Sequence, residues 1–193
     1  MSAPYNINDR MDSLSHTYIP FERLINGDDL KFSAAHFVAH DGFRERLHGH
    51  NYRVSCRLYG QVFRDGLLID PQHFRTTIKS ICQEINGRFL FPQRSNVINS
   101  KFDNGQLVMK CQDGCLFSFP ESDCMILPIV HSTAEELSHY LYNRLIHTLT
   151  PEFLHNRGIF LMEISVFEDL NQAALYRQKI PMSLEGLLLD SPC

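Results

Sequence analysis

The strict alternation of side chains between His48 and Leu58 constrains the fold of this chain more than any other feature. One parity is largely apolar and contains Tyr52, Val54, Cys56 and Leu58. The other parity is polar and contains Asn51, Arg53, Ser55 and Arg57. Successive side chains of a β-strand point to opposite faces, so this pattern predicts a half-buried strand in an antiparallel sheet.

The remaining patterns predict an α+β domain. Strands are expected over residues 30–36, 66–69, 106–110, 115–119 and 160–168. A helix is expected from Pro71 to about Glu84, with Asp70 as its N-cap. A second helix is expected to open at a capping box formed by Ser132 and Glu135. This order favours helices packed on one face of an antiparallel sheet.

The length of 193 residues suits a single domain with short tails. Residues 1–20 are polar without sustained periodicity, which predicts a flexible N-terminal tail. The domain itself is expected to span residues 21–180, and residues 181–193 are expected to form a C-terminal tail.

Charge and composition narrow the class of partner. Lys and Arg number 18 against 22 Asp and Glu, giving a net charge of −4, which argues against nucleic acid as a partner. The sequence contains no apolar stretch long enough for a membrane span, and its first residues do not resemble a signal peptide. Its six cysteines contain no C-x-x-C pair. These features favour a reduced cytoplasmic protein.

Three histidines suggest a metal site. His48 and His50 lie two apart on one strand, so they project from the same face. His36 shares the inward face of the preceding strand, and antiparallel pairing would bring the three imidazoles together. Three histidines with an open position are typical of a catalytic zinc site. Gly49 leaves room for a ligand or another backbone to approach. Three unrelated surface or core histidines are the alternative.

Four segments carry a resemblance to a known family. They are FSAAHFVAHDGFRERLHGHNYRVSCRLYG (32–60), GLLIDPQHFRTTIK (66–79), PIVHSTAEELSHYL (128–141) and ISVFEDLNQAALY (164–176). Together they resemble the 6-pyruvoyltetrahydropterin synthase / 6-carboxytetrahydropterin synthase family.

The resemblance implies a tunnelling fold, with a four-stranded antiparallel sheet and two helices on one face. Three subunits would close a barrel and two trimers would stack into a homohexamer. It also implies Zn2+ as the cofactor and a small-molecule pterin as the substrate. The implied metal ligands are His36, His48 and His50. Glu168 would anchor the pterin, because a carboxylate can accept two parallel N–H bonds. Thr133 and Glu135 match second-helix positions that could contact it.

The sequence departs from the family pattern at its acid/base groups. No cysteine precedes His48, and Asn86 and Gly87 stand where the family has Asp and His. Glu45 occupies the loop of the missing cysteine and resembles the glutamate of apicomplexan-type variants. His131 is a candidate replacement for the missing histidine. Alternatively, Glu45 is only an exposed loop residue.

The resemblance therefore leaves three functions open. The first is a zinc lyase that cleaves the side chain of 7,8-dihydroneopterin triphosphate to give 6-hydroxymethyl-7,8-dihydropterin, with Glu45 as base. The second is ordinary formation of 6-pyruvoyltetrahydropterin. The third is a non-catalytic oligomer that binds pterin or zinc. Residues 93–127 exceed the compact family core, and a loop decoration or a subunit contact is expected there.

Overall fold

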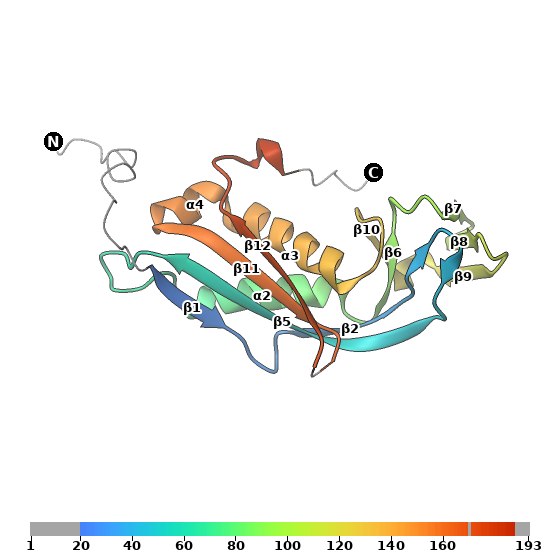
Figure 1. Ribbon diagram of the computed structural model, residues 1–193, viewed down its shortest axis with the longest axis horizontal. Helices are drawn as coiled ribbons and strands as arrows, with labels where there is room; N and C mark the ends of the chain where they lie inside the picture. Colours follow the sequence, from blue (N-terminus) through green and yellow to red (C-terminus); the bar gives the residue numbers. More distant parts are fainter. Residues whose placement is uncertain (1–19, 170, 188–193) are drawn as a thin grey trace.

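A computed structural model describes residues 20–169 and 171–187 of the chain (Figure 1). Its main sheet has the strand order β10-β6-β2-β5-β11-β12, with β1 paired to β5. These strands are β1 (Phe21–Ile25), β2 (Lys31–His36), β5 (His48–Gly60), β6 (Arg88–Pro92), β10 (Cys124–Leu127), β11 (Ile159–Phe167) and β12 (Ala173–Lys179).

The alternation in β5 is confirmed, because Tyr52, Val54, Cys56 and Leu58 are all buried. The expectation of a four-stranded sheet is wrong. Strands β2, β5, β11 and β12 are antiparallel neighbours, but the sheet has seven strands, and β6 runs parallel to both β2 and β10. Strand β6 is buried over Phe89–Pro92 without alternation, so it carries no period-2 signal.

The structure differs from the predicted strands at three further places. Residues 66–69 form no strand but a bent segment, in which the Leu67 and Leu68 carbonyls accept hydrogen bonds from Arg157 rather than from a neighbouring strand. Strand β11 ends at Phe167, so Glu168 lies beyond the strand in which it was expected. Strand β12 was not predicted, since its inward positions carry the small Ala174 and the polar Gln178.

The helices pack on one side of the main sheet (Figure 1). Helix α2 (Pro71–Ile85) begins as predicted, with the Asp70 carboxylate accepting the backbone N–H groups of Gln72 and His73. Helix α3 (Ala134–Leu149) packs against β11 and β12, and the short α4 (Pro151–Asn156) follows it. Their buried faces join the inward side chains of β5 in one hydrophobic core.

The region from 93 to 127 forms a small domain extension. Strands β7 (Ile98–Asp103), β8 (Gln106–Cys111) and β9 (Leu116–Pro120) make a separate three-stranded sheet. The predicted hairpin is thus confirmed as β8–β9, and β7 was missed because its residues 99–102 are all exposed. A 3-10 turn, η1 (Glu121–Asp123), leads into β10.

A second, smaller core joins this sheet to the rest of the domain. It contains Phe37, Phe89, Phe91, Leu107 and Met109, with Phe117 and Phe119 packed against it. The adjacent two-stranded hairpin consists of β3 (Ala39–His40) and β4 (Phe43–Arg44).

The predicted tails are described only in part. Residues 1–19 and 188–193 lie outside the described residues. Residues 181–187 include the 3-10 turn η2 (Leu184–Gly186), and Leu187 packs against the main core. No helix within 20–169 and 171–187 is long and apolar enough to cross a membrane.

Candidate functional site

The pairing of β2 with β5 brings the three predicted histidines together. In this antiparallel register His36 lies opposite His48, and Ala34 lies opposite His50. The three ring centroids are 4.6, 4.9 and 5.1 Å apart. One nitrogen of each imidazole lies within 4.8 Å of the others, so the three side chains could hold one metal ion.

Gly49 makes this close strand pairing possible. A Cβ atom built on Gly49 would lie 2.9 Å from the carbonyl oxygen of Ala34 on β2. Any side chain at this position would push the two strands apart. The glycine between the two histidines therefore serves the approach of another backbone, which is one of the two roles expected for it.

Backbone carbonyls orient two of the imidazoles. His36 Nδ1 donates to the Ser132 carbonyl oxygen at 2.7 Å, and His48 Nδ1 donates to the Arg46 carbonyl oxygen at 2.7 Å. Because a carbonyl can only accept, each Nδ1 carries a proton, which leaves Nε2 as the nitrogen of each ring that can bind a metal. This is the outer-shell arrangement that fixes the tautomer of metal-binding histidines.

His36 is the buried member of the cluster. It is 2% exposed, and its Nε2 is a buried atom without a hydrogen-bond partner among the described residues. Buried polar atoms are normally satisfied, so an ion or a donor at this position is expected. Burial lowers the pKa of His36, and the nearby His48 and His50 lower it further. The neutral imidazole that results is the form that binds a metal.

Ser132 is buried and supports the site from the loop before α3. Its carbonyl accepts from His36, and its hydroxyl donates to the Phe37 carbonyl at 3.0 Å. The predicted role of Ser132 as an N-cap is therefore wrong. Sequence reasoning missed its contact with His36, which lies 96 positions earlier in the chain.

The N-terminus of α3 is shifted by one residue from the predicted capping box. Thr133 is the N-cap, and its hydroxyl accepts the Glu136 N–H at 3.4 Å. The Glu136 carboxylate accepts the backbone N–H groups of Val130 at 2.7 Å and His131 at 3.1 Å. Glu135 consequently has no capping role and is exposed.

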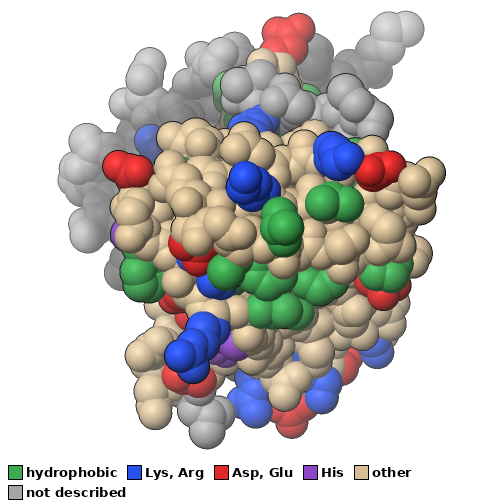
Figure 2. Space-filling view, turned by 90° about the vertical axis from the view of Figure 1, so that its right-hand side faces the viewer, with side chains coloured by type: hydrophobic (Ala, Val, Ile, Leu, Met, Phe, Trp, Pro, Cys, Tyr) green, Lys and Arg blue, Asp and Glu red, His purple; other side chains and the backbone are tan. Residues whose placement is uncertain are grey.

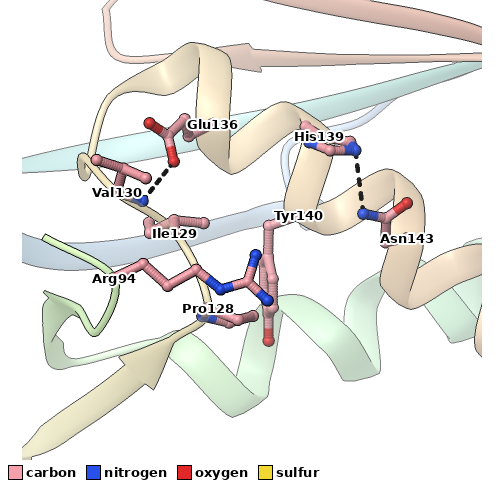
Figure 3. A pocket seen from close by; sticks show the side chains of 8 residues that line it. All are labelled: Arg94, Pro128, Ile129, Val130, Glu136, His139, Tyr140 and Asn143. Atoms are coloured by element: carbon pink, nitrogen blue, oxygen red, sulfur yellow. Dashed lines mark hydrogen bonds between the residues drawn. The ribbon is translucent and has the colours of Figure 1, made fainter. Parts of the chain in front are cut away.

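Glu136 also lines a small cavity of about 110 Å³ between residues 128–130 and α3 (Figure 3). The close-up shows the Glu136 carboxylate directed at the Val130 nitrogen, and Asn143 bonded to His139 farther along the helix. None of the three clustered histidines lines this cavity, so it is separate from the candidate metal site.

Three carboxylates interact electrostatically with one another near the histidine cluster. Burial raises the pKa of Glu168, and the nearby charges of Glu135 and Glu45 raise it further. His50 and His48 act on the Glu168 pKa in the opposite direction. Glu168 therefore lies within electrostatic reach of both histidines and of both other carboxylates, although these residues come from three separate segments.

Glu45 is held in place by the segment just after β2. Its backbone N–H donates to the Val38 carbonyl at 2.9 Å, and its Oε2 accepts the Val38 N–H at 3.0 Å. The side chain is half-buried, and its charge raises the pKa of His36. Glu45 is thus an ordered carboxylate beside the cluster, which argues against the alternative of a simple exposed loop residue.

The structure gives the other predicted residues definite contacts. His131 Nδ1 donates to the Ala39 carbonyl at 2.9 Å, so its ring is tied to the β3–β4 hairpin. Asn86 Oδ1 accepts the Ser33 N–H at 2.8 Å, and the Gly87 N–H donates to the Ser33 carbonyl at 2.7 Å. The pair that replaces the family's Asp and His therefore joins the end of α2 to β2.

Tyr52, which sequence reasoning assigned only to the core, adjoins the histidine cluster. Its ring centroid lies 5.4 Å from that of His50 and 5.9 Å from that of His36. Its hydroxyl is buried without a partner among the described residues, and burial raises its pKa. The parity shared by His48, His50 and Tyr52 is the signal that could have identified it.

Comparisons with known proteins agree with this geometry. The family model described as 6-pyruvoyl tetrahydropterin synthase matches residues 28–179. The chain therefore belongs to the 6-pyruvoyl tetrahydropterin synthase family, and its α+β architecture fits the tunnelling fold.

Among curated relatives, a putative 6-carboxy-5,6,7,8-tetrahydropterin synthase of Methanocaldococcus jannaschii is 30% identical over 150 residues, covering 77% of this chain and 90% of the relative. Among solved structures, the Plasmodium falciparum 6-pyruvoyl tetrahydropterin synthase is 37% identical with a TM-score of 0.83, covering 84% of this chain and all of the other.

The Plasmodium vivax 6-pyruvoyltetrahydropterin synthase is also 37% identical, with a TM-score of 0.82 over 83% of this chain and 99% of the other. One of its structures is described as a catalytic-residue mutant in which a glutamate is replaced by alanine.

Proposed function

We propose that this chain is a zinc-dependent lyase that acts on 7,8-dihydroneopterin triphosphate in pterin and folate biosynthesis. Side-chain cleavage to 6-hydroxymethyl-7,8-dihydropterin is the favoured reaction, with 6-pyruvoyltetrahydropterin as a further product. The observation that carries the proposal is the ordered Glu45 carboxylate beside three convergent imidazoles.

His36, His48 and His50 fit a zinc ion by chemistry and orientation. Each offers one imidazole nitrogen as a ligand atom, and the His36 Nε2 is buried without a partner among the described residues. When bound, zinc would lower the pKa of substrate side-chain hydroxyls as a Lewis acid. The Ser132 and Arg46 carbonyls would keep two of the ligand rings in the required tautomer.

Glu168 is proposed to bind the pterin ring. A carboxylate can accept two parallel hydrogen bonds from the 2-amino group and the adjacent ring N–H. Its position just after β11 places it within reach of His50, so ring binding there would direct the substrate side chain toward the histidines. Thr133 and Glu135 are proposed to border the same pterin site from the start of α3.

Glu45 is proposed to be the general base. It would take the proton of the C2′ hydroxyl, and the C2′ oxygen would become an aldehyde oxygen as the C1′–C2′ bond breaks. The electron pair of that bond would pass into the conjugated pterin ring, and a proton returned to C1′ would complete the hydroxymethyl group. His131, tied to Ala39 through Nδ1, is the candidate for returning a proton.

The Plasmodium vivax relative supports this role, because a glutamate of that protein is described as a catalytic residue. We assign the corresponding role to Glu45, which stands in the loop before the HGH segment.

We also propose that the chain assembles as a cytoplasmic homohexamer, a dimer of trimers. Strand β12 lies at an edge of the main sheet, and its Leu175 side chain is 53% exposed. A second copy that continued the sheet at this edge would pair with β12 and cover this side chain. The mass in solution, measured by light scattering, tests the assembly.

Product analysis tests the reaction. The zinc-loaded protein is incubated with 7,8-dihydroneopterin triphosphate, and the pterins are separated by chromatography. We expect 6-hydroxymethyl-7,8-dihydropterin from the wild type and its near-complete loss in Glu45→Gln, which keeps the size of the side chain. A pyruvoyl product without any hydroxymethyl product would refute the proposed cleavage.

A non-catalytic pterin-binding oligomer is the second candidate. The observation that favours it is the structural use of Asn86 and Gly87, which bond to Ser33 instead of supplying an acid/base pair. This alternative predicts tight binding of the pterin without turnover, and the same incubation distinguishes the two.

A further inference from the structure

Arg44 connects the three-stranded extension to the loop that carries Glu45. Its Nε donates to Asp113 Oδ2 at 2.7 Å, and its Nη1 donates to the Glu45 carbonyl oxygen at 2.7 Å. Its Nη2 donates to Cys115 Sγ at 2.9 Å. One guanidinium therefore donates hydrogen bonds both to the turn between β8 and β9 and to the backbone carbonyl of the proposed base.

The aromatic side chains beneath this guanidinium restrict it further. The Arg44 guanidinium carbon lies 5.4 Å from the Phe117 ring centroid and 5.9 Å from that of Phe37. The two rings are stacked with centroids 5.0 Å apart. The Arg44 side chain is only 15% exposed, so the two rings restrict its guanidinium more than that of a surface arginine, whereas its partner Asp113 is 41% exposed.

The turn that receives Arg44 is itself ordered. Asp113 Oδ1 accepts the Cys115 N–H at 3.0 Å, which leaves Oδ2 for Arg44. The neighbouring Gln112 accepts the Gly42 N–H at 3.3 Å, and Gly42 lies in the turn of the β3–β4 hairpin. The β8–β9 turn thus contacts the β3–β4 hairpin, which leads into Glu45, at two positions: Gly42 and Arg44.

The extension is also fixed to the segment that follows the first histidine. Phe37 comes directly after His36 and belongs to the second core together with Leu107 and Met109 of β8. This core cannot move without disturbing β2. The β8–β9 hairpin and the segment that follows His36 therefore pack on the same core.

Figure 2 shows the end of the molecule that contains the extension, where hydrophobic side chains form a band between charged groups.

We infer that the 93–127 extension positions Glu45 for catalysis, with Arg44 as the positioning residue that transmits the constraint. This inference rests on the proposed role of Glu45 as the base. It gives the extension a function in the site, where the sequence suggested only decoration or a subunit contact. The Arg44 side chain bonds the backbone of Glu45 and leaves its carboxylate available.

The variants Arg44→Ala, Arg44→Lys and Asp113→Ala test this inference in the zinc-loaded protein. Lys101→Ala is the matched control, because it breaks the exposed Lys101–Asp103 pair on the same extension without touching the Glu45 loop. A misplacement of a catalytic group by about 1 Å costs about 100-fold in rate. We therefore expect kcat to fall by up to about 100-fold in Arg44→Ala, with KM and zinc content within twofold of wild type.

Arg44→Lys should fall between wild type and Arg44→Ala, since an ammonium keeps the charge but not the planar fork. Hydrogen exchange of the Glu45 amide should accelerate in Arg44→Ala. The amide donates to the Val38 carbonyl, and this hydrogen bond should open more often once Arg44 no longer holds the Glu45 backbone. In a Glu45→Gln background, Arg44→Ala should reduce the residual rate no further.

Unchanged exchange at the Glu45 amide in Arg44→Ala would overturn the inference whatever the activity. A wild-type kcat in Arg44→Ala, or an equal loss in the Glu45→Gln background, would also overturn it. Failure of the proposed function is distinguishable, because Glu45→Gln would then behave as wild type.

Discussion

Two adjacent glutamates at the start of α3 allow a sharp test of how this part of the site is held. Glu135→Ala and Glu136→Ala remove the same charge from the first turn of the same helix. The capping box expected from the sequence assigns the structural role to Glu135, whereas the structure assigns it to Glu136. Any favourable interaction with the helix dipole is similar for both, so it cancels in the comparison.

The magnitude follows from the two bonds of Glu136. Its carboxylate accepts backbone N–H groups at 2.7 and 3.1 Å. Hydrogen bonds to charged groups contribute about 1.5–3 kcal/mol each when shielded. Glu136 is only half-buried, and water can reach the Val130 N–H after truncation. We therefore expect Glu136→Ala to lower the free energy of unfolding by about 2 kcal/mol in total, and Glu135→Ala to change it by less than about 0.5 kcal/mol.

Urea denaturation at fixed protein concentration measures the two values. For a chain of this size, about 2 kcal/mol corresponds to a decrease in Tm of about 4–8 °C. Glu135→Ala should leave Tm nearly unchanged and weaken pterin binding instead. Equal destabilisation by the two variants would refute the assignment of the structural role to Glu136 rather than Glu135.

Two further predictions concern the histidine cluster and the extension. His48→Ala should weaken zinc binding by at least about 100-fold, since even a change to a residue that only orients a metal ligand costs about 10–100-fold. The control is His73→Ala, which changes an exposed histidine on α2. The measurement is the zinc content per chain after dialysis against a chelator. Full zinc retention in His48→Ala would remove the metal assignment. The hydrogen bonds from the Cys115 N–H and Arg44 lower the pKa of Asp113. The ionised Asp113 carboxylate should therefore stabilise the fold fully above the ordinary carboxyl pKa, and this stabilisation should disappear as the pH falls through the lowered pKa of the folded protein. The difference in Tm between wild type and Asp113→Asn, followed from pH 7 downward, should decrease on acidification; a difference that grows would contradict this sign.

The amino-acid sequence alone determined the features that depend on neighbouring residues. The alternation of β5 predicted its buried face, and the two-residue spacing of His48 and His50 placed both on one side of the strand. The start of helix α2 was predicted at the correct residue, because Asp70 and Pro71 mark it, and its end was predicted within one residue. These features follow from the fixed periods of strands and helices, which any local segment expresses.

The tertiary structure decided how distant segments meet. The register of β2 on β5 set His36 opposite His48, and the loop before α3 supplied the Ser132 carbonyl that orients His36. The N-cap of α3 is Thr133, whereas the sequence pattern predicted Ser132. Packing placed Asp113 against Arg44, 69 positions away in the chain. Hydrogen bonds of this kind depend on which buried surfaces fit together in the folded chain, and no local periodicity encodes that fit.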